Sequence, residues 1–347
     1  MDKKHQKNLW LGAIMLILLP LLVFWVFRDH YQEILNNIRA IPAGALLSLL
    51  GLGLLYQLLE SAASLMLIRS QLPDFSFMQA LEVTFLGVFA NVAAFGAGTL
   101  PLQSWYLYRC GLAAGSGAST MTLGYTFHKA SILLYTTVML LLQRKWLAGQ
   151  GAGLFRYMLL GYGVCTLIII GLLMLCAWDL VQWLACWGID RLPERGKWKT
   201  RKVRWKESLS ALYAQSKRLL RDRGRLCKVL LWNCLKLFCL YLTLFLALRL
   251  AGETALSLWR VQLLGGLMHM ITNALPNVAG MGPAEFSFLL VFSHYLAGGQ
   301  LSSALILYRT ATYFFPFMVS AFVSLPIQRR AAKSDRPSSP PPGIAGT

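Results

Sequence analysis

Ionisable side chains interrupt long apolar stretches of this chain, where a charge needs a partner or water. They are Glu60, Glu82, His128, Lys129, Lys236, His269, Glu285 and Arg309. At the centre of a membrane helix, a charge costs roughly 2.5–3.5 kcal/mol on insertion scales, so each group implies an ion pair or a polar cavity. Glu60, Glu82 and Lys236 lie near enough to the expected helix ends to extend toward the membrane surface. His269 is expected to be a satisfied core histidine.

His128, Lys129, Glu285 and Arg309 differ from the other groups because they lie on or beside interruptions rich in Asn, Gly and Pro. Glu285 and Arg309 are expected to form a charge-assisted pair that a polar head group could exchange with. The sequence predicts that a central polar cavity binds a substrate through Asn91, Gln103, His128, Lys129, Asn273, Asn277, Glu285 and Arg309.

The two interruptions cover residues 95–101 and 275–283 and lie inside apolar stretches. Glycine and proline leave backbone groups without helical partners. Lipid cannot satisfy these groups, so each interruption is expected to be buried in protein or to line a wet cavity. The alternative is an ordinary loop at the membrane surface.

The two interruptions also align with each other at an offset of 182 residues. The shift pairs Asn91 with Asn273, Gly98 with Gly280, Pro101 with Pro283, and Gln103 with Glu285. Each interruption is followed by a short apolar piece, 99–113 and 284–297, which either spans the membrane or re-enters it. One half begins by running inward at 43–68 and the other outward at 227–250, so the repeats are predicted to be inverted, as in many transporters.

The amino-acid composition predicts that the charged side chains described above belong to a membrane protein. Of the 347 residues, 56% are hydrophobic and 14% are charged, against about 45–50% and about 25% in soluble domains. Apolar runs as long as 9–27 predict membrane-spanning helices. The expected fold is an all-α polytopic membrane protein with two inverted-topology repeats, each with a broken or re-entrant element. Its expected spans are 9–27, 43–68, 78–97, 117–142, 154–187, 227–250, 259–276, 284–297 and 301–327.

Positive charge predicts the orientation. Of the formal net charge of +19, residues 190–228 carry +10, from 14 basic and 4 acidic residues. Basic loops beside spans lie on the cytoplasmic side, so this loop and both termini are expected inside a cell inner (plasma) membrane, and nucleic-acid binding is disfavoured. The loop is read as an amphipathic helix on the inner leaflet, or as a plain topology anchor. Residues 154–187 would then cross once, as one long or tilted helix.

The expected organisation is a membrane domain over 1–327, with repeats at 43–142 and 227–325, a basic loop at 189–226 and a disordered tail at 328–347. The seven cysteines form no CxxC pair and are read as apolar residues. Common hydrolase and nucleotide-binding motifs are missing, so the expectation is no cofactor, no metal and no enzyme activity.

Residues 275–285 are similar to the proline, glycine-rich stretch and glutamate of the flippase-like domain of lysylphosphatidylglycerol synthases. Tyr308-Arg309 resembles that family's arginine in the following helix, and Leu100-Pro101 with residues 106–109 resembles its proline and downstream basic motif. The resemblance covers roughly 10–327. The chain departs from the pattern at Pro283, and at Trp105-Tyr106 where many members show Gly-Glu.

The resemblance implies a membrane domain that moves a polar or anionic lipid between leaflets, such as a glycolipid, an aminoacyl-lipid or an isoprenoid-linked lipid. In the best-known relatives an aminoacyl-transfer domain follows; the resemblance here is to the translocating part alone. Two alternatives stay open: an accessory scaffold for a lipid- or glycan-modifying enzyme, and an integral-membrane transferase. The lipid, the direction, the energy source and the oligomeric state are left open.

Overall fold

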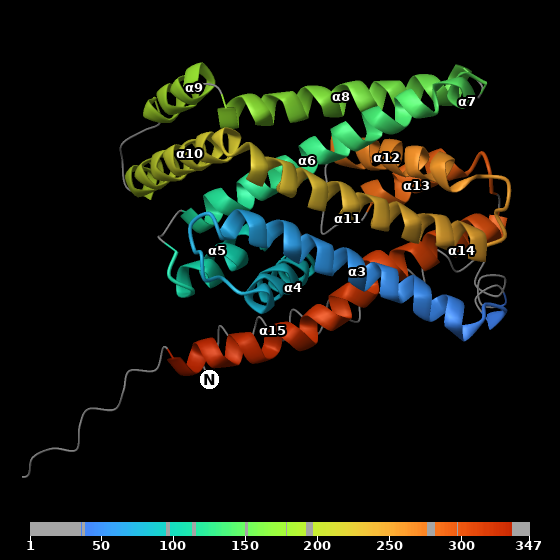
Figure 1. Cartoon of the computed structure of the whole chain (residues 1–347), viewed down its shortest axis with the longest axis horizontal. Helices are drawn as coiled ribbons and strands as arrows, with labels where there is room; N and C mark the ends of the chain where they lie inside the picture. The colour runs from blue at the N-terminus through green and yellow to red at the C-terminus, as the bar shows by residue number, and fades with distance from the viewer. Residues whose placement is uncertain are drawn as a thin grey trace, which may run out of the picture.

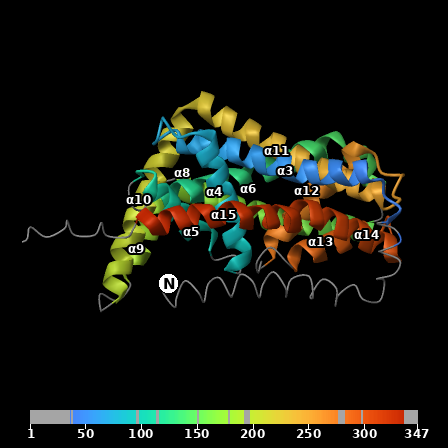
Figure 2. The ribbon, with the colours of Figure 1, turned by 90° about the horizontal axis from the view of Figure 1, so that it is seen from below.

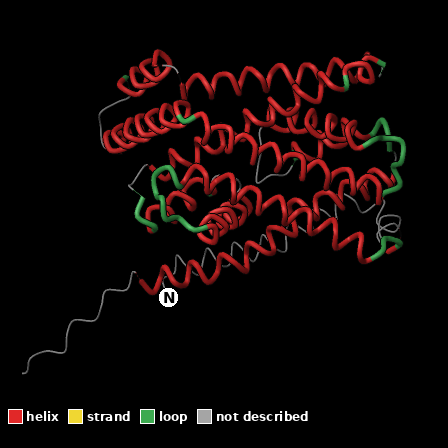
Figure 3. Tube along the Cα trace, in the orientation of Figure 1, coloured by secondary structure: helices red, strands yellow, loops and turns green. Residues whose placement is uncertain are grey.

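The computed structural model describes residues 36, 39–94, 98–112, 116–149, 152–177, 179–191, 197–275, 282–296 and 298–334. Within these ranges the chain is helical and has no strand, which confirms the all-α class (Figure 3). Most helices lie along one long axis, and the loops gather mainly at its two ends (Figure 1). The expected first span, 9–27, and Asn277 lie outside the described residues.

Two groups of helices follow the same order along the chain. The first comprises α3 (Ala43–Ile68), α4 (Phe77–Ala93), α5 (Thr99–Arg109) and α6 (Ser116–Leu142). The second comprises α11 (Arg223–Leu250), α12 (Leu258–Ala274), α13 (Pro283–Phe292), α14 (Gly298–Arg309), the π-helical turn η2 (Thr310–Phe314) and α15 (Phe315–Ser334). The helices α4 and α12 both have 17 residues. The short pieces expected after the interruptions are therefore present as α5 and α13.

The long helices of the two groups run in opposite directions along the long axis. The chain passes along α3 from right to left in Figure 1 and along α11 from left to right. Likewise, α6 runs from left to right, whereas α14, η2 and α15 run from right to left. Residues 95–97 and 276–281 lie outside the described part, so the expected meeting of the two interruptions stays a prediction.

Serine caps begin the second helix of each group. Ser76 accepts a hydrogen bond from the backbone N–H of Gln79 at 3.2 Å, and the Gln79 side chain accepts one from the N–H of Ser76 at 2.8 Å. At the matching place, Ser257 accepts from the N–H of Arg260 at 3.4 Å. Such caps satisfy donors at the helix start and contribute about 1 kcal/mol each, so local sequence defines where α4 and α12 start.

Within the described residues, the helices long and apolar enough to cross a membrane cover Ala43–Ile68, Ser116–Leu142, Arg223–Leu250 and Gly298–Ile327. The main apolar core lies between the two groups and contains buried side chains from α3, α6, α11, α12, α13 and α14. Examples are Leu49, Ile132, Leu237, Leu264, Phe288 and Leu305. The two groups therefore share one core.

The connecting segment corrects one expected span. Residues 154–187 do not form a single helix: α8 (Ala152–Ala177) is followed by α9 (Asp179–Asp190), which has a different direction. The basic loop folds as α10 (Lys197–Arg221), which lies across one end of the bundle with α9, while the short α7 (Arg144–Ala148) lies at the other end (Figure 2). Only α8 in this segment follows the long axis of the bundle.

The last helix also differs from its expected end. The sequence placed the start of a disordered tail at residue 328, but α15 continues to Ser334. Residues 329–333 read Arg-Arg-Ala-Ala-Lys, and Ala, Arg and Lys are strong helix formers, so the helix extends beyond its apolar part. Residues 335–347 lie outside the described part.

Candidate functional site

A pair of opposite charges stands where the second group of helices is interrupted. Arg309 Nε lies 2.7 Å from Glu285 Oε1, and the two side chains are 10% and 28% exposed. The other carboxylate oxygen of Glu285 accepts the backbone N–H of Gly282 at 2.6 Å. Gly282 has a φ of 87°, a conformation that favours glycine. Glu285 thus starts α13 and also binds the end of α14, which confirms the expected pairing.

The helix containing Arg309 changes its winding directly after that residue. Residues Thr310–Phe314 form a π-helical turn, and such turns are frequent at functional sites. Pro316 follows and has no N–H to donate into this turn. The guanidinium carbon of Arg309 lies 4.2 Å from the ring centre of Tyr313, so the widened turn places an aromatic ring beside the cation.

Close packing by α3 holds this turn in place. A Cβ at Gly53 would lie 1.9 Å from the carbonyl oxygen of Ala311. Only glycine lets α3 approach η2 so closely. The position of Arg309 therefore depends on the first group of helices as well as on its own.

A second polar contact joins the two groups. Lys129 on α6 donates to the side-chain oxygen of Asn273 at the end of α12. The ammonium also lies 4.8 Å from the ring centre of Tyr125. Asn273 Nδ2 is buried and has no hydrogen-bond partner among the described residues. Sequence reasoning placed Lys129 and Asn273 in one site, and the structure brings them together.

Two histidines near this contact also have unsatisfied atoms. Nδ1 of His128 and Nδ1 of His269 are buried without a hydrogen-bond partner within the described part. The expectation that His269 is satisfied is therefore wrong, because Tyr241 covers it with a ring 5.6 Å away rather than with a hydrogen-bond partner. His269 interacts electrostatically with Lys129, Lys236 and Arg309. Buried polar atoms without partners are uncommon in proteins and often mark a place for water or a ligand.

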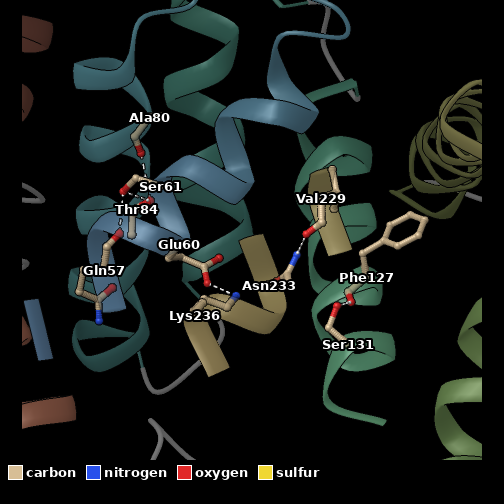
Figure 4. Close-up of polar contacts among 10 residues, drawn as sticks. All are labelled: Gln57, Glu60, Ser61, Ala80, Thr84, Phe127, Ser131, Val229, Asn233 and Lys236. Atoms are coloured by element: carbon tan, nitrogen blue, oxygen red, sulfur yellow. Dashed lines mark hydrogen bonds and ion pairs between the residues drawn. The ribbon is translucent and has the colours of Figure 1, made fainter. Parts of the chain in front are cut away.

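The third charged contact corrects another expectation. Lys236 does not extend to the membrane surface: its side chain is 0% exposed and pairs with Glu60 of α3 (Figure 4). It is the 14th of 28 residues in α11, too far from either end to reach the surface. Glu60 is 33% exposed. Lys236 lies at the middle of an apolar stretch of the sequence, and this position was the signal that could have assigned it to a buried pair.

Polar residues around this pair form hydrogen bonds both between helices and within α11. Ser61 Oγ lies 2.9 Å from Thr84 Oγ1 of α4, and Asn233 of α11 donates to the carbonyl of Val229 at 2.8 Å. Figure 4 shows these groups beside Glu60 and Lys236, with α6 close by. The sequence analysis did not single out Ser61, Thr84 or Asn233, since hydroxyl and amide side chains are common within membrane helices.

The residues predicted in the first interruption do not join this charged set. Gln103 of α5 donates to the carbonyl of Val83 at 3.1 Å and so ties α5 to α4. Asn91 lies in the last turn of α4 and is partly buried. Glu82 pairs with the hydroxyl of Tyr106, another contact between α4 and α5. No three His, Cys, Asp or Glu side chains of the described ranges come together as a metal site.

The described site is thus a set of buried and partly buried charges among apolar helices, with Glu285 and Arg309 at the start of α13 and the end of α14. The family model for the lysylphosphatidylglycerol synthase TM region matches residues 10–320 of this chain. The chain belongs to this family. The matched region is the one associated with lipid flipping, and it is distinct from the catalytic domain of the synthases. No curated protein matches the chain.

Membership of the lysylphosphatidylglycerol synthase TM family makes this a multi-pass membrane protein. It also gives the buried charges a setting: they lie in a region associated with lipid flipping rather than with aminoacyl transfer. A charged group inside a membrane protein is a functional candidate by default because of its cost. Glu285, Arg309, Lys129 and Asn273 are the candidates that the geometry supports.

Proposed function

We propose that this chain is a translocase that moves a polar or anionic lipid between leaflets of the inner (plasma) membrane. The observation that carries the proposal is the Glu285–Arg309 pair, at 2.7 Å, between the short helix α13 and the last residue of α14, directly before a π-helical turn. A head-group phosphate can compete for the guanidinium, and a head-group amine can compete for the carboxylate. Such exchange would let a charged head group cross without being bare in lipid.

The proposal includes an architecture of two inverted repeats with the site at their interface. It is supported by the matching helix orders and by the opposite directions of α3 and α11. The contacts Lys129–Asn273 and Glu60–Lys236 each join one repeat to the other. In transporters with inverted repeats, one repeat rocks against the other around such a site, and contacts between repeats are those that change.

The experiment is reconstitution of the purified chain in liposomes that contain trace lipid with a fluorescent head group or tail. A membrane-impermeant quencher added outside measures how fast label reaches the outer leaflet. We expect translocation at least about tenfold faster than in protein-free liposomes for a polar or anionic lipid. A folded, reconstituted protein that moves none of the phospholipids and glycolipids tested would contradict the proposal and favour an accessory role.

The proposed orientation has α10 and both termini in the cytoplasm. A cysteine-free variant carrying Ser210→Cys on α10 should resist a membrane-impermeant thiol reagent added to intact cells. Lys145→Cys on α7, an exposed position at the other end of the bundle, should react. Reaction at Ser210→Cys with protection at Lys145→Cys would reverse the orientation.

A further inference from the structure

A stripe of polar positions runs along one face of α12 inside the bundle. Gln262, His269 and Asn273 follow one another at helical spacing, with Gly266 between the first two. Residues three or four positions apart share one face of a helix, so the stripe is continuous. Residue 273 lies 11 positions after residue 262, which is about 16 Å along the axis. At this end of the stripe, Asn273 accepts a hydrogen bond from Lys129 of α6.

Neighbouring helices face this stripe with polar groups of their own. Tyr135 of α6 donates to Gln262 Oε1 at 2.6 Å. A Cβ at Gly266 would lie 2.6 Å from Thr136 Oγ1 of α6. Tyr241 of α11 covers the next position, with its ring 5.6 Å from the imidazole. We call the stripe and these three side chains the polar track between α6, α11 and α12.

Four buried atoms of the polar track have no hydrogen-bond partner among the described residues. They are Nδ1 of His269, Nδ2 of Asn273, Oγ1 of Thr136 and the hydroxyl oxygen of Tyr241. Thr136 and Tyr241 are both 0% exposed. Internal water molecules typically bind such groups, with about three hydrogen bonds each. Water, hydroxyl groups and imidazole in a row are also the groups that pass protons in proteins.

The polar track leads from one end of the bundle to its middle. Gln262 follows Arg260 by two residues, and the guanidinium carbon of Arg260 lies 5.2 Å from the ring centre of Trp146 of α7. The proposed orientation puts α7 outside the cytoplasm. The other end of the track is at Lys129, the 14th of 27 residues in α6. Protons from outside would therefore reach the middle of the bundle.

His269, within the polar track, lies among charges that do not balance. The charged and titratable groups that interact with it or with its partners are Lys129, His128, Lys236, Tyr241, Arg309, Glu60, Glu285 and Cys165. The two carboxylates pair with two of the three cations, so one positive charge is left. Positive charge repels a proton from an imidazole, and we expect His269 to be neutral until a negative charge enters.

A negatively charged head group at these cations would remove the repulsion. Binding of the anion and binding of a proton at His269 then favour each other, because such coupling is reciprocal. A phosphodiester carries a charge of about −1 at neutral pH, and one proton balances it. The net charge of the buried set is therefore the same before and after both arrive. A carrier with this coupling moves the anion and the proton in the same direction.

We infer that His269 takes up a proton that arrives along the polar track from the α7 side, and that this proton crosses the membrane with the anionic head group of the transported lipid. The proton passes from water to the imidazole nitrogen that carries none, and no other bond forms or breaks. This inference rests on the proposed function, because it names the ion that accompanies the lipid. It also adds a direction: with acid outside the cell, lipid moves inward.

The test is reconstitution of the full-length chain in liposomes of phosphatidylethanolamine and phosphatidylglycerol. Trace phosphatidylglycerol with a fluorescent tail and a membrane-impermeant quencher report the lipid, and trapped pyranine reports the pH of the lumen. An acidic lumen should raise the outer-to-inner ratio of label at least about threefold, since about one pH unit permits about tenfold for one proton per lipid. A potassium diffusion potential without a pH gradient should not change the ratio, because the proton and the head group together are neutral.

The outcomes separate this inference from the proposed function. Translocation with the same label ratio with and without the pH gradient would overturn the inference and leave the proposed function standing. Accumulation driven by the potential alone would also overturn it, since the head group would then cross without a proton. Protein-dependent proton entry without movement of label would refute the coupling and the proposed function. If neither protons nor label move, both fail.

One pair of variants tests the histidine. His269→Phe keeps a ring against Tyr241 and removes the nitrogen that takes the proton. It should abolish the effect of the pH gradient on the label ratio, whereas His294→Phe, at an exposed histidine after α13, should leave the effect unchanged. A folded His269→Phe protein that still accumulates label with the gradient would refute the proton site.

A second variant tests the polar track and remains informative if His269→Phe does not fold. Tyr241→Phe removes a buried hydroxyl group without a partner in the described part, so thermal melting in detergent should not fall. Proton entry measured with pyranine should fall at least about threefold. A role in packing alone predicts that proton entry stays the same, and this result would remove the track from the account.

Discussion

The two interruptions of the chain hold their short helices by different means. At the first, the neutral Gln103 side chain ties α5 to α4 through the carbonyl of Val83. A Cβ at Gly87 would lie 2.3 Å from Gln103 Nε2, so the two helices are in close contact there. At the second interruption, Glu285 aligns with Gln103 in the sequence but pairs with Arg309 at the end of α14.

This difference separates a packed junction from one that a ligand can open. The amide of Gln103 has a backbone partner on a neighbouring helix, and the charged Glu82 between the same two helices is bound by the hydroxyl of Tyr106. The Glu285 carboxylate remains 28% exposed and is shared between Gly282 and Arg309. We therefore expect the first junction to stabilise the fold, and we propose that a polar lipid displaces the charges at the second.

The largest expected effect concerns the buried pair between the repeats. Glu60→Gln leaves the fully buried Lys236 without a counter-charge, and we expect a loss of about 3–5 kcal/mol in the free energy of unfolding. Lys236→Met should cost less, since Glu60 is partly exposed. Chemical unfolding in detergent measures both, with the exposed Glu207→Gln as control. If the Glu60→Gln protein is as stable as wild type, the Glu60–Lys236 pair contributes no more to stability than we expect of the Glu285–Arg309 pair, and the distinction between them fails.

An intermediate effect is expected when the first junction is given the residue of the second. In Gln103→Glu an acceptor replaces the donor that faces the carbonyl of Val83, which should cost about 1–3 kcal/mol of unfolding free energy. Gln79→Glu on α4 is the control, because a glutamate can still accept the N–H of Ser76 in that exposed cap. If Gln103→Glu and Gln79→Glu have the same unfolding free energy, the Gln103 hydrogen bond does not stabilise the junction between α4 and α5.

The smallest effect concerns an ion pair outside both junctions. A hydrogen bond from Lys206 lowers the pKa of Asp190, and Lys202 adds to the effect. A lowered pKa contributes stability above the unfolded value of about 3.9, and this contribution is lost as the pH falls through the folded pKa. We expect acid to loosen α9 from α10 before the bundle unfolds. Hydrogen exchange of α9 near pH 3 and 7 measures this, and an equal rate in wild type and Asp190→Asn at pH 7 would contradict it.

Much of the fold follows from local sequence signals. Apolar runs predicted the long helices, and the interruptions predicted the short helices α5 and α13, because clustered Gly and Pro destabilise a helix interior. The break between α8 and α9 was missed, although the charged Asp179, a residue type that favours helix starts, interrupts the apolar run where α9 begins. Opposite-running halves were expected from charge and order; α3 and α11 run in opposite directions, and the inverted repeat stays a prediction.

The site was predictable only where charge and interruption coincide. Glu285, Arg309, Lys129 and Asn273 were found on that basis, and they form two contacts. Gln103 and Asn91 were placed in the same cavity by alignment, but alignment does not show that Gln103 has a backbone partner on α4. Lys236 was misjudged although its central position in an apolar stretch indicated burial; the sequence did not show that its partner is Glu60, 176 residues away.

The central claim is that the Glu285–Arg309 pair serves passage of lipid rather than folding. The direct measurement compares translocation in liposomes with thermal melting in detergent for wild type, Glu285→Gln and Arg309→Gln. A glutamine at 285 keeps an acceptor for the N–H of Gly282, so melting should stay nearly unchanged. Translocation should fall at least about tenfold, equivalent to roughly 1.4 kcal/mol in the barrier. If both variants are unstable, the pair is structural; if both are stable and still move lipid, the pair does not belong to the path.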